Sequence, residues 1–377
     1  MQAGRGGEGG PKAKGKKGMK KTKKVLMLGL DGLSFDLVMD LIGRGKLKTL
    51  EKFTREGAYC RLHTTFGKSY FKFLPMRTIQ SATAWTSIMT GKVVKKHRIY
   101  GFRDRSGTWV NSSMVKDKRI WDILSELGYR VCVINIPVTY PPQPVNGVMV
   151  SGIPVPKEAK DLVYPESLRR QMDGYRVEIP FKEYEKEYPN LDYEKLKRDA
   201  YDVIDKRFKF AMKMLKEDWD LFIVNFLSID DIQHFCWHFT DKNHPQYDGS
   251  LVERFGDMIA EFCEYGDKIV RTMLQAVDKN TDVIVLSDHG NSSKFESFDA
   301  RSYVRKKVST LAGVMKKDAM TGDHSPIGML FAYGPDIRSC GRVKDADGID
   351  VAPTVLHLLD LPAPEDMDGK PLKDMLS

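Results

Sequence analysis

The chain has 377 residues, of which 60 are lysine or arginine and 51 are aspartate or glutamate, so its formal net charge is +9. A hydrophobic fraction of 41% beside 29% charged residues excludes disordered and collagen-like chains. Nine basic residues and a single acid lie in residues 1–24, and the rest of the chain is close to neutral. No apolar run approaches the roughly 20 residues that a membrane-spanning helix needs.

Residues 1–23 are predicted to be a disordered basic leader, followed by one catalytic domain at 24–377. The apolar run VLMLGL after the lysines is shorter than the ~7–15 residues of a signal-peptide core, and it ends at Asp31. The five cysteines form no C-x-x-C pair. We therefore expect a reduced, cytoplasmic protein without a membrane partner.

Strand and helix patterns alternate from Lys24 onward. Continuous apolar runs, typical of strands buried on both faces of a parallel sheet, cover residues 25–31, 130–138, 221–228, 282–288 and 329–334. Helical patterns cover residues 34–44, 47–56, 81–91, 117–127, 196–216, 249–277 and 350–359. This alternation predicts an α/β fold, a three-layer sandwich with a mostly parallel central sheet.

Two segments interrupt the alternation. Residues 139–200 are rich in proline, tyrosine and charge and show no long apolar strand, which indicates an inserted cap subdomain. Residues 291–323 are polar and indicate a second, smaller insertion. The cap aromatics could stack on a base, although packing is the simpler role for most of them; they are Tyr164, Tyr175, Phe181 and Tyr184.

Acidic and histidine side chains follow several of the predicted strands. Asp31 ends the first strand, and Asp230 follows the third, with His234 four residues later on the same helix face. Asp288 and His289 end the fourth, and a late loop supplies His324. Ligands of open α/β sheets bind beyond the carboxyl ends of the strands, so we expect these six side chains on one rim.

Each of these signals alone also fits a helix cap, a turn or a surface hydrogen bond. Together they do not, because unpaired buried carboxylates at one rim would repel each other. One or two divalent cations remove that cost. Mixed aspartate and histidine ligands suit Zn²⁺ or Mn²⁺, with Fe as a further possibility, better than Ca²⁺ or Mg²⁺.

A two-metal site of this kind performs phosphoryl transfer when a hydroxyl nucleophile lies beside it. Four hydroxyls lie on the predicted helix 81–91: Ser81, Thr83, Thr86 and Ser87. A hydroxyl in the first turn also gains from the positive end of the helix. For Thr86 and Ser87, capping and packing are equally good explanations.

These motifs, in this order, resemble the type I phosphodiesterase/nucleotide pyrophosphatase branch of the alkaline phosphatase superfamily. The matching segments run from Lys24 to Leu372 and are VLMLGLDGLSFD, SATAWTSIMTGKVVKKHRIYGF, FLSIDDIQHFCW, VIVLSDHG, GDHSPIG and DVAPTVLHLLDLPAPEDMDGKPL. A sulfatase is a poorer match, because that branch has Pro and Arg where this chain has Thr83 and Trp85.

The resemblance implies a role for each of these residues. The ligands of one metal ion would be Asp31, Asp288, His289 and the nucleophile oxygen, and those of the second would be Asp230, His234 and His324. The family's nucleophile lies ten residues before the Gly of a Thr-Gly pair, which is Gly91 here, and this spacing points to Ser81. The family often has Pro two residues later; Thr83 stands there instead and is kept as a rival nucleophile.

The implied function is a metal-dependent phosphohydrolase, a phosphodiesterase or nucleotide pyrophosphatase that forms a covalent phosphoserine. Its partner would be a small phosphate ester, possibly a nucleotide. The first alternative is a phosphomonoesterase or phosphotransferase on the same fold. The remote alternative is a non-catalytic protein that binds nucleic acid through the basic leader, a partner that we do not expect.

Four further residues near these motifs are not expected to be ligands. His238 and His244 are interpreted as surface residues or supports of the site. Cys236 and Asp231 point away from the face that Asp230 and His234 share, and core packing is the expected role of Cys236.

Overall fold

The computed structural model describes residues 23–64, 79–187, 190–293 and 319–377. The predicted leader lies outside the described residues apart from Lys23. So does most of the second predicted insertion, of which only the two ends are described. In the part of the chain that is described, no helix combines the length and apolarity needed to cross a membrane.

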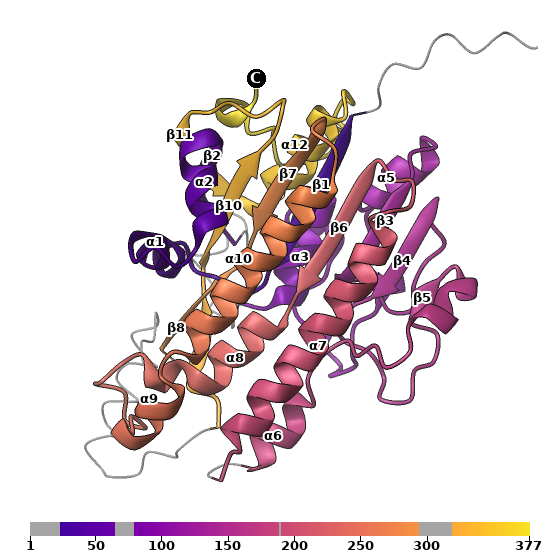
Figure 1. Cartoon of the computed structure of the whole chain (residues 1–377). Coiled ribbons are helices and arrows are strands. Elements are labelled where there is room, and N and C mark those ends of the chain that lie inside the picture. The colour runs from indigo at the N-terminus through magenta and orange to yellow at the C-terminus, as the bar shows by residue number, and fades with distance from the viewer. Residues whose placement is uncertain (1–22, 65–78, 188–189, 294–318) are drawn as a thin grey trace, which may run out of the picture.

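A ten-stranded sheet runs through the middle of the molecule (Figure 1), in the order β11-β2-β10-β7-β1-β6-β3-β4-β5, with β12 beside β2. The strands are β1 Lys24–Leu30, β2 Ala58–His63, β3 Val131–Ile136, β4 Gly147–Ser151, β5 Val163–Tyr164, β6 Leu221–Phe226, β7 Thr281–Leu286, β10 Ile327–Tyr333, β11 Gly341–Arg342 and β12 Ala346–Asp347. The central strands β7, β1, β6, β3 and β4 are all parallel to their neighbours in this series, whereas β10 is antiparallel to both β7 and β2. The predicted α/β class with a mostly parallel sheet is confirmed.

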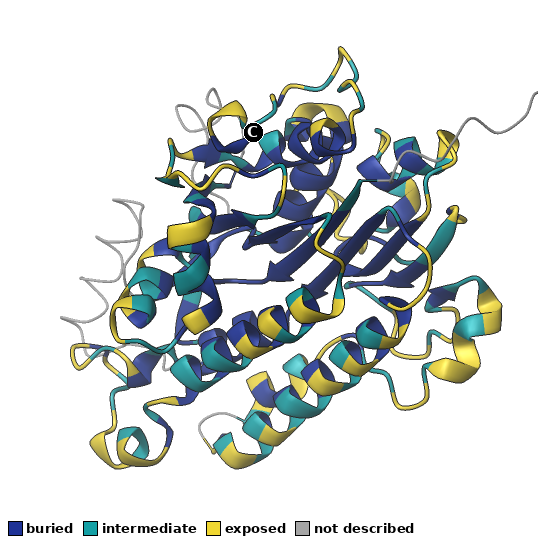
Figure 2. Ribbon diagram, turned by 45° about the horizontal axis from the view of Figure 1, so that its top comes forward, coloured by how far each residue is buried: buried dark blue, intermediate teal, exposed yellow. Residues whose placement is uncertain are grey.

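Helices cover both faces of this sheet, because its central strands are apolar on both sides. In β1, Leu26 and Leu28 pack into one core, and Val25 and Met27 pack into the other. The first core is covered by α1 Phe35–Gly43, α2 Lys48–Glu56, α7 Tyr193–Met214, α8 Ser228–Cys236 and α10 Met258–Ala276. The second is covered by α3 Ser81–Thr90, α5 Ile120–Glu126 and α12 Val351–Leu358. Figure 2 shows the resulting layers, with buried strands between helices whose outer faces are exposed.

The remaining elements lie around the carboxyl edge of the sheet and its flanks. They include the short helices α4 Val94–His97, α6 Phe181–Glu187 and α9 Gly249–Phe255. A separate two-stranded sheet is formed by β8 Gly290–Ser293 and β9 Gly322–Ser325, which run antiparallel. It brings the segment after β7 next to the segment that carries His324, because Asn291 pairs with His324.

Two predicted elements differ from the structure. The single helix expected over 249–277 is two helices, α9 and α10, separated at Gly256 and Asp257. Phe255 at the end of α9 packs against the rings of Tyr193 and Phe239, which gives the short helix a packing site of its own. The segment expected to lack a long strand, 139–200, contributes β4 and β5 to the sheet, and α7 begins inside it. Both strands are short, and the role of this segment as a cap stays a prediction.

The amino terminus of α2 is capped by a residue from another helix. Its own N-cap, Leu47, offers no side-chain acceptor. Instead the buried carboxylate of Asp267 on α10 accepts the backbone N–H groups of Thr49 at 3.0 Å and Leu50 at 2.8 Å. This contact satisfies two donors that a helix start leaves unpaired, and it joins α2 to α10.

Replacing this cap should therefore destabilise the fold. We expect Asp267→Ala to lower the free energy of unfolding by about 2 kcal/mol, because two buried N–H groups lose their acceptor. Asp267→Asn should lose less, since its amide oxygen still accepts. Urea unfolding measures both, with Asp257→Ala as the control, because Asp257 caps α10 without a side-chain hydrogen bond. Equal stability of the two alanine variants would contradict the role given to Asp267.

Candidate active site

Three carboxylates meet at the carboxyl edge of the sheet because three adjacent parallel strands end there. Gly29 in β1 pairs with Asn225 in β6 and with Leu286 in β7, so the residues after these strands emerge side by side. Asp31 follows β1, Asp288 follows β7, and Asp230 lies in the first turn of α8 after β6. All three are at most 4% exposed.

The first group of side chains is centred on His289. Its Nε2 atom lies 3.5 Å from an oxygen of Asp31 and 3.5 Å from an oxygen of Asp288. It also lies 3.1 Å from Oγ of Ser81, the first residue of α3. The structure therefore brings together the four residues that the resemblance assigns to one metal ion.

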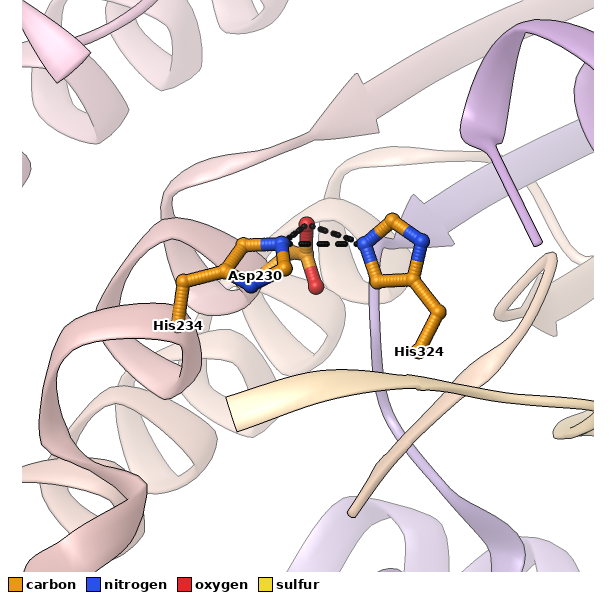
Figure 3. A group of neighbouring side chains, drawn as sticks. All are labelled: Asp230, His234 and His324. Carbon is orange, nitrogen blue, oxygen red and sulfur yellow. Dashed lines mark hydrogen bonds and ion pairs between the residues drawn. The ribbon is translucent and has the colours of Figure 1, made fainter. Parts of the chain in front are cut away.

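The second group consists of Asp230, His234 and His324 (Figure 3). An oxygen of Asp230 lies 3.2 Å from Nε2 of His234 and 3.5 Å from Nε2 of His324. The two Nε2 atoms are 2.9 Å apart. Each of the three residues offers one ligand atom, and these atoms lie within 4.8 Å of one another. The same separation holds for the set Asp31, Asp230 and His289, which links the two groups.

Backbone carbonyls orient all three histidines. The Nδ1 atoms of His234, His289 and His324 lie 3.1, 3.0 and 2.5 Å from the carbonyl oxygens of Gly322, Gly290 and Ile79, respectively. A carbonyl only accepts, so each Nδ1 carries the proton and each Nε2 presents a lone pair to the carboxylates. The Nε2 pair of His234 and His324 requires something positive between the two rings, either a shared proton or a cation.

The buried carboxylates of the first group have too few hydrogen-bond donors among the described residues. Burial, followed by the charge of Asp230, raises the pKa of Asp31 to about 6. Burial and the neighbouring Asp31 raise the pKa of Asp288 well above its usual range. Both oxygens of Asp288 and one of Asp31 have no hydrogen-bond partner among the described residues. Acceptors without donors, together with histidines that present lone pairs, are the donor set of a divalent cation site.

The histidines respond to their surroundings in opposite directions. Burial, and then the nearby His324, lower the pKa of His289 to about 3, so this ring is neutral. Burial also disfavours a charge on His234, but the carboxylate of Asp230 outweighs it and raises the pKa of His234. Of the two groups, the second is thus the one in which a histidine, His234, attracts a proton when no metal ion is bound.

Three supporting residues were not predicted from the sequence. The indole N–H of Trp85 and the amide of Asn225 donate to one oxygen of Asp31, at 2.8 and 2.7 Å. The amide of Asn291 donates to Asp230 at 2.6 Å. Sequence signals for two of them exist: Trp85 lies one helical turn after Ser81, and Asn225 is a polar residue inside an apolar strand. These donors hold the carboxylates in place and leave their other oxygens for a ligand.

The other candidates lie apart from the two groups. The rival nucleophile Thr83 is buried on α3, and its Oγ1 has no hydrogen-bond partner among the described residues. His238 and His244 are buried, so of the two roles expected for them the surface position is wrong. Nδ1 of His238 lies 3.1 Å from Oγ1 of Thr321. The Cys236 thiol packs against Met258 in the core.

The cap aromatics have mixed placements. Tyr184 is fully buried and donates to Asp199 at 2.6 Å, so it is a packing residue. Phe181, in contrast, lies at the site, because its ring meets the His234 ring edge-on at a centroid distance of 5.7 Å.

Comparison with known proteins places this geometry in context. Residues 25–346 match the family model of type I phosphodiesterases/nucleotide pyrophosphatases. Two curated proteins match shorter stretches. GPI ethanolamine phosphate transferase 2 of Kluyveromyces lactis is 23% identical over 172 residues, which are 43% of this chain and 18% of that protein. The 2,3-bisphosphoglycerate-independent phosphoglycerate mutase of Salinibacter ruber is 27% identical over 125 residues, 32% of this chain and 20% of that protein. The chain thus spans only about a fifth of these curated relatives.

Solved structures share the fold over nearly the whole chain. Murine ectonucleotide pyrophosphatase/phosphodiesterase 5 superposes with a TM-score of 0.57 at 12% identity, covering 94% of this chain and 100% of that one. The wild-type alkaline phosphatase PafA superposes with a TM-score of 0.55 at 13% identity, covering 96% and 100%. At such identities the likeness shows a common fold.

The crowding of carboxylates gives a test that needs no substrate. In chelator, Asp288→Asn should raise the free energy of unfolding by about 1 kcal/mol, because it removes one of two repelling charges and its amide can donate to Asp31. With Zn²⁺ or Mn²⁺ present, the variant should instead be less stable than the wild type, because it has lost a metal ligand. Thermal unfolding in both conditions measures this.

The matched control is Asp282→Asn, a buried acid on β7, the strand that precedes Asp288, whose oxygen accepts the backbone N–H of Asp336. The difference in stability between Asp282→Asn and the wild type should keep its sign when metal is added. The cation site would be contradicted if Asp288→Asn were less stable than the wild type in chelator. It would also be contradicted if the difference between Asp288→Asn and the wild type had the same sign in chelator and in metal.

Proposed function

The chain belongs to the type I phosphodiesterase/nucleotide pyrophosphatase family, and from this premise we propose that it hydrolyses phosphodiester or pyrophosphate bonds with Ser81 as the nucleophile and two divalent metal ions. The observation that carries the proposal is the position of Ser81. Its Oγ atom lies 3.1 Å from His289, a member of the carboxylate–imidazole groups, at the amino terminus of a helix.

The residues present suit the proposed metal ions. Asp31, Ser81, Asp288 and His289 would hold one ion, and Asp230, His234 and His324 would hold the other. The unpartnered oxygens of Asp31 and Asp288 and the facing lone pairs of the histidines support Zn²⁺ or Mn²⁺, with Fe as a further possibility. Bound there, such ions would neutralise the carboxylates, favour the alkoxide form of a serine and attract the oxygens of a phosphate ester.

The chain's own residues define the rest of the chemistry. Without a bound ion, the Ser81 hydroxyl donates a hydrogen bond to Nε2 of His289, which holds Oγ beside the ligand atoms. His289 is too weak a base to remove that proton unaided, because burial lowers its pKa to about 3. The serine proton passes to water, and the serine oxygen forms a bond to phosphorus while the bond from phosphorus to the leaving oxygen breaks. The alcohol or phosphate that leaves takes up a proton from water. Water then cleaves the phosphoserine and restores Ser81.

A phosphotransferase is a second candidate function on the same site. The match to a GPI ethanolamine phosphate transferase favours it, since an acceptor hydroxyl in place of water would convert hydrolysis into transfer. Phosphomonoester hydrolysis is a further alternative, because these ligands are compatible with both ester types. The partner that we propose is a small phosphate ester, such as a nucleotide.

The cellular setting is also a proposal. All five cysteines are unpaired, and four of them are buried, which supports a reducing, cytoplasmic location. Nucleic-acid binding through the leader stays a prediction, because the leader lies almost wholly outside the described residues.

Ser81 and Thr83 can be separated by kinetics. We expect Ser81→Ala to lower kcat for bis-p-nitrophenyl phosphate at least about a thousandfold, because the covalent step is lost. Thr83→Val, which removes a buried hydroxyl at similar volume, should keep most of the activity. The same assay on p-nitrophenyl phosphate compares diester with monoester cleavage. Full activity of Ser81→Ala would show that Ser81 is not the nucleophile. If only Thr83→Val lost activity, the nucleophile would be Thr83.

Metal content tests the ligands directly. Protein purified without chelator and loaded with Zn²⁺ or Mn²⁺ should hold two equivalents by elemental analysis. His324→Ala should hold about one, because the second group then has two ligands. His238→Ala is the control, a buried histidine outside both groups, and should keep two. Wild-type protein that binds no metal would contradict the proposal.

A further inference from the structure

Two positively charged side chains lie over one exposed indole ring. The guanidinium carbon of Arg103 is 3.9 Å from the centre of the Trp109 ring, and Nζ of Lys182 is 5.1 Å from it. Trp109 is 43% exposed, and both cations are exposed as well. Arg103 and Trp109 face each other across a short antiparallel bridge, whereas Lys182 reaches the ring from α6.

These two cations have no carboxylate of their own within ion-pair distance in the described ranges. Asp104, which follows Arg103, instead accepts the backbone N–H groups of Ser106 and Thr108. Glu178 acts on Lys182 only at longer range. The indole ring attracts both cations but cannot cancel their mutual repulsion. Like charges gathered in this way are suited to binding an anion between them.

The cation pair is anchored next to the active site on both sides. Phe102, which precedes Arg103, donates its N–H at 2.7 Å to the side chain of Gln80, the residue before Ser81. Val110, which follows Trp109, packs in one cluster with Ala82, the residue after Ser81.

On the other side, Phe181 precedes Lys182 and meets the ring of His234. The three residues Arg103, Trp109 and Lys182 therefore belong to segments that contact the nucleophile helix on one side and the second ligand group on the other.

We propose that Arg103, Trp109 and Lys182 form a subsite for a second phosphate group of the substrate, separate from the phosphate that Ser81 attacks. The inference rests on the proposed function and narrows it to phosphodiesters with an additional phosphate. Nη1 of Arg103 donates to the carbonyl oxygen of Gly107, which leaves the other donors of the guanidinium for a phosphate. Lys182 adds a second charge, and the Trp109 ring attracts both cations.

Two chromogenic substrates test the subsite. They are the p-nitrophenyl ester of thymidine 5′-phosphate and the same compound with a 3′-phosphate, which share the scissile bond and the leaving group. We expect the wild type to have a KM roughly tenfold lower for the 3′-phosphorylated compound, with similar kcat, as one pair of charge-assisted contacts would give. The double variant Arg103→Met/Lys182→Met should lose this preference, so that its KM values for the two substrates are nearly equal.

The control is the double variant Arg105→Met/Lys186→Met. It removes the same charges from the same two segments, but neither residue lies over Trp109 among the contacts of the described chain. It should keep the preference. An equal KM ratio in the wild type and in Arg103→Met/Lys182→Met would overturn the inference.

A second measurement does not depend on turnover. Acrylamide quenching reports mainly Trp109, because Trp85, Trp121 and Trp219 are buried and Trp237 is only partly exposed. Thymidine 3′,5′-bisphosphate should reduce acrylamide quenching of the metal-loaded wild type more than thymidine 5′-phosphate does. In Trp109→Phe, the two compounds should have the same effect on quenching. Protection without hydrolysis of either ester would support the subsite and reject the proposed function. Hydrolysis without a 3′-phosphate effect in either measurement would overturn the subsite alone.

Discussion

The concentration of buried negative charge at one edge of the sheet is the constraint on which the rest of the structure depends. Parallel pairing of β7, β1 and β6 makes Asp31, Asp230 and Asp288 emerge together, and the fold then covers them. Burial without compensation would cost several kcal/mol for each charge. Hydrogen bonds from Trp85, Asn225 and Asn291 offset part of this cost. The oxygens that remain unpartnered are those that a cation would bind.

Close backbone approach is what allows this crowding. A Cβ atom at Gly32 would lie 2.4 Å from an oxygen of Asp230, and one at Gly322 would lie 2.5 Å from the carbonyl oxygen of Gln233. Gly32 also has φ of +77°, a conformation that other residues adopt only with strain. The carbonyl of Gly322 in turn orients His234. Glycine at these positions is thus part of the ligand geometry.

The fold and the six acidic and histidine side chains were predictable because they lie in local patterns. Continuous apolar runs mark the strands, and each of three runs leads into an aspartate within a few residues. Other features depend on tertiary contacts that no local pattern encodes. The Asp267 cap of α2 crosses more than two hundred residues, and β4 is short and lies among prolines. In the sequence, nothing distinguishes Arg103, Trp109 and Lys182 from ordinary surface residues. They come together only because the loop near Gln80 and helix α6 pack beside each other.

Anomalous diffraction from crystals soaked in Zn²⁺ or Mn²⁺ would test the central claim most directly. The account predicts two strong peaks at the carboxyl edge of the sheet, one among Asp31, Ser81, Asp288 and His289, and one among Asp230, His234 and His324. Absence of both peaks in crystals that retain these side chains in order, or peaks only elsewhere on the surface, would contradict it.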